Sequence, residues 1–86
     1  MQEFTTQVAS NIQNDSLSLE VVNKMGECIA VVERFDTEKT LRFELLTSSL
    51  DVACVQAILE IAQKELRAFE DGTPLSEAKR DCHIST

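Results

Sequence analysis

The chain has 86 residues, of which 43% are apolar and 27% charged, so it has room for one small globular domain and is not disordered along its length. Its 15 acidic and 8 basic residues leave a net charge of −7, which disfavours binding to nucleic-acid phosphates and anionic lipid surfaces. A domain of this size has a thin core, which disfavours the deep pocket of an enzyme.

The N-terminal part of the sequence predicts a β-hairpin. Apolar and polar residues alternate over about residues 3–12 and again over 16–22, as in strands with one buried face. Between them, residues 13–15 have side chains that favour a tight turn. Gly26 follows the second strand and readily takes a positive φ, so another turn is expected there.

Two further strands are expected over about residues 27–35 and 39–46. The first of them has apolar residues at both odd and even positions between Cys28 and Val32, which is typical of a strand covered on both faces. The other alternates cleanly, and its apolar positions are Leu41, Phe43 and Leu45. Because the four strands have short connections, we expect antiparallel neighbours in a β-meander.

After Ser48 the apolar period becomes that of a helix, which we expect over about residues 50–71. Ser48 is the predicted N-cap, with Asp51 in the place of the capping-box acid, and Gly72 is the predicted C-terminal stop. The apolar residues of the helix recur at spacings of three and four: Val55, Ile58, Ala62, Leu66 and Phe69. They are expected to pack on one sheet face, against Leu17, Leu19, Leu41 and Phe43.

Residues 1–72 are thus expected to form a single two-layer α+β domain, a four-stranded antiparallel β-meander followed by one long α-helix. Thr73 and Pro74 predict the start of a short helical turn. The rest of residues 73–86 has no periodicity, so we expect a flexible tail there.

The sequence offers two kinds of candidate for catalysis, its 15 carboxylates and its cysteines. The carboxylates are spread over expected turns and exposed faces, so we expect them to form a solvated surface and not an acid–base pair in a pocket. Cys82 and His83 place a thiol beside an imidazole, and Cys54 lies near a helix N-terminus, which can lower a thiol pKa. Adjacent residues in a tail cannot hold a fixed catalytic geometry, and Asp51 opposes the effect on Cys54. Cys54 and Cys28 are expected to be small core residues. We therefore expect no catalytic residue and no enzyme; a small cysteine-dependent enzyme or redox-responsive protein is the alternative.

Neither a cofactor nor a metal site is expected. One histidine and three scattered cysteines do not supply the roughly four ligands of a zinc site, and the two glycines form no phosphate-binding loop. A basic stripe for nucleic acid and an apolar run of membrane-spanning length are both missing from the sequence. The odd number of cysteines suits the reducing cytoplasm.

Two features favour a protein partner. Val52, Leu59 and Ile61 widen the apolar stripe of the helix, and the third strand is apolar on both parities although one helix covers only one sheet face. We expect a homodimer or another protein at the apolar sheet face or the helix flank, unless the C-terminal segment covers these residues.

Together with the acidic charge, this predicts a small acidic, non-catalytic protein-binding module whose surface attracts a basic partner protein. Inhibitors, immunity-type proteins and phage or plasmid accessory proteins are examples of that class. The resemblance is one of general properties only, because fold does not imply function.

Overall fold

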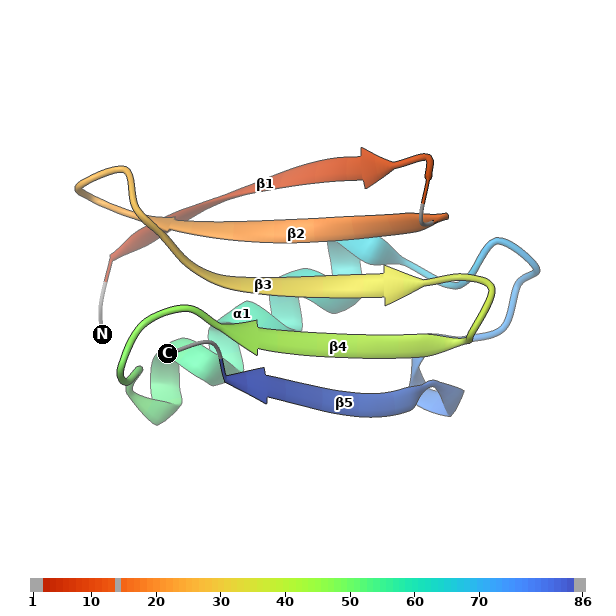
Figure 1. Ribbon diagram of the computed structural model, residues 1–86. Coiled ribbons are helices and arrows are strands. Elements are labelled where there is room, and N and C mark those ends of the chain that lie inside the picture. Colours follow the sequence, from red (N-terminus) through yellow and green to blue (C-terminus); the bar gives the residue numbers. More distant parts are fainter. Residues whose placement is uncertain (1–2, 14, 85–86) are drawn as a thin grey trace.

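The computed structural model describes residues 3–13 and 15–84, which form a five-stranded sheet and one long helix, α1 (Val52–Leu66) (Figure 1). The strands are β1 (Phe4–Asn11), β2 (Ser16–Asn23), β3 (Cys28–Phe35), β4 (Thr40–Leu45) and β5 (Lys79–Ile84), and they lie side by side in chain order. The α+β class predicted from the sequence is confirmed.

Strands β1 to β4 form the predicted antiparallel meander, and each begins and ends within one residue of its expected position. Gly26 has a φ of 83° in the turn after β2, as expected. The side-chain oxygen of Asn23 accepts hydrogen bonds from the backbone N–H groups of Met25 and Glu27, which fixes this turn. In the turn after β1, Asp15 also has a positive φ, whereas Asn14 lies outside the described residues.

The expected flexible tail is wrong for residues 79–84, which form β5. This strand pairs in parallel with β4, from Lys79 opposite Thr40 to Ile84 opposite Leu45. A parallel neighbour requires a long crossover, and the chain makes it through α1 and a short 3-10 helix, Leu75–Glu77. The short helical turn predicted after Pro74 is therefore present.

Both predicted ends of the long helix need correction. Asp51, not Ser48, is the N-cap, since its carboxylate accepts a hydrogen bond from the backbone N–H of Cys54 at 2.7 Å. The helix ends at Leu66 because Arg67 takes a φ of 58°, which is not helical. Gly72 closes a turn in the following loop, where its N–H donates to the carbonyl of Phe69.

The core lies between α1 and the central strands β2 and β3. Its buried residues are Leu19, Val21, Ile29, Ala30, Val32, Cys54, Ile58, Ala62, Leu66, Phe69 and Leu75. The predicted helix residues Ile58, Ala62 and Leu66 are among them, and Phe69 enters the core from the loop after α1. The predicted sheet residues Leu41 and Phe43 are only partly buried at its margin.

This placement of the core follows from the path of α1, which runs diagonally behind the sheet (Figure 1). The helix packs on β2 and β3. The helix-facing side of β4 and β5 is therefore left partly open.

The opposite face of the sheet is polar. Val31, the apolar residue of β3 near its centre, lies between Glu20 of β2 and Glu44 of β4. The side chain of Gln7 donates to Glu20 at 2.6 Å, which adds a polar contact at this level of the sheet. The sequence of β3 predicted an apolar surface on this face of the sheet. In the structure, charged side chains on both neighbouring strands interrupt that surface.

Candidate functional site

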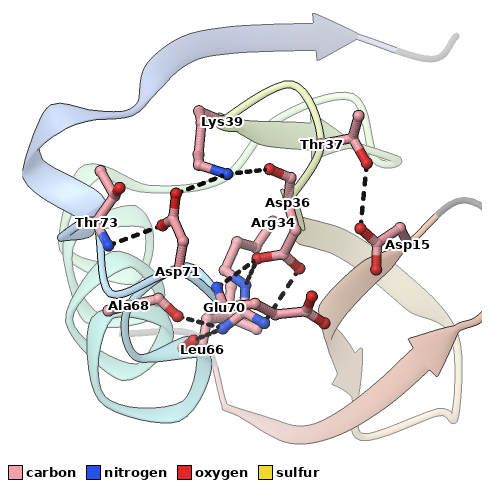
Figure 2. A network of polar contacts seen from close by, with 10 residues as sticks. All are labelled: Asp15, Arg34, Asp36, Thr37, Lys39, Leu66, Ala68, Glu70, Asp71 and Thr73. Carbon is pink, nitrogen blue, oxygen red and sulfur yellow. Dashed lines mark hydrogen bonds and ion pairs between the residues drawn. The ribbon is translucent and has the colours of Figure 1, made fainter.

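Arg34 and Asp36 form a buried ion pair at the end of β3, and their hydrogen bonds join it to the end of α1 and the loop that follows (Figure 2). Arg34 donates hydrogen bonds to the backbone carbonyls of Leu66 and Ala68, the second at 2.7 Å. The last carbonyls of a helix have no N–H partner within the helix, so Arg34 supplies the missing donor there. Its guanidinium also lies 3.2 Å from the carboxylate of Asp36.

Asp36 belongs to the only group of acidic residues, among those described, that is close enough to hold a metal ion. Oxygen atoms of Asp15, Asp36 and Glu70 lie within 4.8 Å of one another. One carboxylate oxygen of Asp36 accepts the backbone N–H of Glu70 at 3.0 Å, and the other accepts from Arg34. Because the positive guanidinium already compensates this carboxylate, we interpret the network as structural.

Lys39 and Asp71 extend the network toward the surface. The ammonium of Lys39 donates to the carbonyl of Asp36 at 2.7 Å and lies 3.2 Å from the carboxylate of Asp71. The same ammonium lies 5.6 Å from the ring centre of Phe69, a cation–π contact. These contacts hold the loop after α1 against the turn between β3 and β4.

The three cysteines lie on three different elements. Cys54 is buried in α1, as expected, whereas Cys28 at the start of β3 is exposed and does not belong to the core. Neighbouring atoms shield each sulfur from solvent, fully at Cys54 and only partly at the exposed Cys28, and this desolvation raises the pKa of both thiols. The charges of Asp51 and Glu20 raise the pKa of Cys54 and Cys28, respectively, further. A raised pKa leaves less of the reactive thiolate at neutral pH. The side chain of His83 lies outside the described part of the chain. The expectation that Cys82 and His83 form no catalytic pair therefore stays a prediction.

An apolar groove lies between α1 and the strands β4 and β5. Its volume is about 440 Å³, and its walls are formed by Val32, Leu41, Phe43, Val55, Leu59, Arg80 and Cys82. A hollow of about 50 Å³ shares Leu41, Leu59 and Arg80 with the groove and reaches Leu75. The groove exists because α1 packs mainly on β2 and β3 and covers this side of β4 and β5 only in part.

The groove continues along an exposed flank of α1. Val52, Val55 and Leu59 are spaced by three and four residues and so share one side of the helix. Val52 is 72% exposed and Leu59 37%. Arg80 is the one charged residue in the groove wall, and among the described side chains it has no ion-pair partner. The groove is therefore an apolar surface with a single positive charge.

Part of this groove was open to prediction. Val52 and Leu59 are two of the three residues that widened the predicted helix stripe, while Ile61 lies half-buried on the other flank. The contribution of Arg80 and Cys82 was missed because β5 was not expected. One signal was available: four strands about 4.8 Å apart make a sheet wider than a helix of about 10 Å can cover.

Comparison of the chain with protein-family models, curated proteins and solved structures gives no match. Within residues 3–13 and 15–84, no helix is long and apolar enough to cross a membrane.

Proposed function

We propose that the chain is a small acidic, non-catalytic protein-binding module, and that it takes an apolar segment of a basic partner protein into the groove between α1 and the strands β4 and β5. The groove itself is the observation on which this proposal depends. Its wall includes Leu59 and continues to Val52, two large apolar side chains that the folded chain leaves in contact with solvent. Exposed apolar surface of this kind typically marks a binding site.

A helix is the segment that fits this groove. One helix of about 10 Å diameter covers roughly two strands of a sheet, and this sheet has five. A partner helix beside α1 would complete the second layer and cover Leu41 and Phe43. Helices bind in such grooves through apolar residues at spacings of three and four, and an acidic residue among them would pair with Arg80.

The net charge supports a partner that is basic outside the buried segment. A charge of −7 on a small domain attracts a basic protein at long range and raises the association rate at low salt. On α1, Glu60 and Glu65 are exposed and lie outside the groove wall. Salt should therefore slow association, while the apolar groove contacts determine how slowly the complex dissociates.

The alternative, a cysteine-dependent enzyme or redox-responsive protein, has one observation in its favour: Cys82 lines the groove. A cysteine nucleophile also needs a base held within hydrogen-bond reach and a lowered thiol pKa. The pKa values of Cys28 and Cys54 are raised, which disfavours those two thiols as nucleophiles. Around Cys82, the described residues of the groove wall are apolar apart from Arg80 and include no histidine or carboxylate that could act as the base. Binding is therefore the function that the geometry supports better.

Affinity capture from the source cells tests the proposal with two matched variants. Leu59→Lys places a charge in the groove wall, whereas Met25→Lys makes the same change of charge in an exposed turn, where Met25 is 83% exposed. We expect the wild type and M25K to retain one protein that L59K loses. We also expect recovery of that protein to fall as salt is raised.

Equal recovery with L59K and M25K would contradict binding in the groove. A substrate screen gives the alternative its own test, with Cys82→Ser as the variant. Turnover that disappears in C82S, together with no captured partner, would replace the binding proposal by the enzyme.

A further inference from the structure

Strand β1 is an edge of the sheet without the usual protection against pairing. Among the described strands it has β2 as its only neighbour, so every second residue directs its backbone N–H and C=O away from the sheet. From Phe4 to Asn14 the sequence contains no charged residue and no proline, although 27% of the chain is charged. Its pairing with β2 runs without a bulge from Phe4 to Asn11. Charges, prolines and bulges are the features that normally keep edge strands apart.

The other edge of the same sheet differs. β5 begins with three consecutive charged residues, Lys79, Arg80 and Asp81. Charged residues on an edge strand oppose pairing with another chain. Of the two edges, β1 is therefore the one suited to accept a further strand.

Exposed apolar side chains accompany this free edge. Val8 is 44% exposed at the middle of β1, and Ile12, just after its end, is 93% exposed. Phe4, Val8 and Ile12 are an even number of residues apart, so along a regular strand they lie on the same face. Val8 pairs with the core residue Leu19, which identifies this face as the one toward α1.

We propose that two copies of this chain pair through β1, antiparallel across a two-fold axis, so that their two five-stranded sheets become one continuous sheet. In a two-fold interface, each residue near the axis meets the same residue of the other copy. Like charges there would repel, and each copy already has a net charge of −7. Pairing of two identical copies therefore requires an uncharged edge strand. A basic partner protein would instead bind better to an edge strand with acidic side chains.

The exposed residues also select a register. Facing residues of an antiparallel pair must direct their backbone groups in the same sense, both toward the other strand or both away from it, so the allowed registers differ by two residues. With Val8 opposite the partner's Val8, Thr6 faces the partner's Ser10, and Ile12, in the turn directly after β1, lies beside the start of the partner's β1 at Phe4. The neighbouring registers would place Val8 opposite Thr6 or Ser10 instead. The first register is the one that covers the exposed apolar side chains with apolar ones.

Sedimentation equilibrium of the purified chain in the micromolar range tests the pairing. We expect a dimer for the wild type and for M25K, and a monomer for Val8→Lys, which brings two lysines together at the axis. Circular dichroism checks that V8K is folded. If it is not, Ile12→Lys at the exposed turn replaces it in the test, and we expect this variant to lower the affinity of the two copies for each other at least tenfold. A monomeric wild type, or a folded V8K or I12K variant that dimerises like the wild type, would overturn the proposal.

This pairing does not depend on the groove, and L59K separates the two. L59K should dimerise like the wild type even where it loses the captured partner. A dimer that L59K dissociates and V8K leaves intact would place self-association in the groove and overturn pairing through β1.

Cysteine cross-linking tests the register in a C28S/C82S background, in which the remaining Cys54 is buried. Facing residues have Cα atoms about 4.5 to 5.5 Å apart, which suits a disulfide. We expect Val8→Cys to form a covalent dimer on mild oxidation. A Thr6→Cys chain and a Ser10→Cys chain should form a covalent dimer with each other when the two variants are mixed. Neither variant should cross-link to itself, because the two copies of position 6, or of position 10, lie about 14 Å apart in this register. Efficient cross-linking of T6C alone would contradict this register.

Discussion

Replacing Arg34 with methionine should remove the charge that holds the end of α1 to β3. Arg34 and Asp36 are both buried, and the guanidinium also donates to the carbonyls of Leu66 and Ala68. Removing one partner of a buried ion pair costs about 3 to 5 kcal/mol, because the other charge stays buried without compensation. A chain of this length is expected to have an unfolding free energy of about 4 to 13 kcal/mol. R34M should therefore lose a large fraction of its stability.

Asp36→Asn is the complementary change. The asparagine keeps an oxygen that can accept the N–H of Glu70, but it no longer balances the charge of Arg34. The loss should be smaller than for R34M, about 1.5 to 3 kcal/mol, because Arg34 keeps the carbonyls of Leu66 and Ala68 as hydrogen-bond acceptors. In the double variant R34M/D36N neither charge is buried, so its loss should be smaller than the two single losses together by about 1 to 3 kcal/mol.

Urea titrations followed by far-ultraviolet circular dichroism measure these free energies, since the sequence has no tryptophan or tyrosine for fluorescence. A loss below about 1 kcal/mol for R34M would be that of an ordinary surface ion pair. That result, or losses that simply add in the double variant, would refute the structural role given to this network.

Three further predictions concern α1 and the loop after it. Leu66→Ala should lower the unfolding free energy by about 2 to 5 kcal/mol because Leu66 is fully buried, and an unchanged urea midpoint would remove it from the core. Arg67→Gly should raise stability by about 1 kcal/mol, since Arg67 has φ 58° and ψ −143°, a region that suits glycine; a loss would show that no strain is relieved. For Asp71, hydrogen bonds from Thr73, and then from Lys39, lower the pKa from 3.8 to about 2. Its contribution to stability should be complete above pH 4 and lost as pH falls toward 2, and Asp71→Asn should remove this part of the pH dependence; an NMR titration midpoint of the Asp71 carboxyl near 4 would contradict the shift.

The meander could be predicted because each of its strands has a clear pattern. Alternation such as that of Leu41, Phe43 and Leu45 has a period that only an extended strand with one buried face explains. The turn at Gly26 could be predicted for a similarly local reason, since glycine takes a positive φ without cost. Strands and turns whose structure depends on residues close in the sequence could therefore be predicted from the sequence alone.

β5 and the end of α1 could not be read in this way. β5 begins with Lys79, Arg80 and Asp81, so what identifies it as a strand is its pairing with β4 and not an apolar pattern. Phe69 continues the apolar spacing of the helix, yet it reaches the core from a loop whose position depends on Arg34, distant in the sequence. The groove lies between α1 and β5, so its full outline could not be predicted from the sequence for the same two reasons.

The binding of a partner in the groove, which is the central proposal, is tested most directly by site-specific photo-crosslinking in the source cells. A photoreactive amino acid replaces Leu59 in the groove wall, and Met25 in the exposed turn is the matched control. We predict that position 59 captures one other protein through an apolar segment, and that position 25 does not capture it. No adduct from position 59, or the same adducts from both positions, would contradict the proposal.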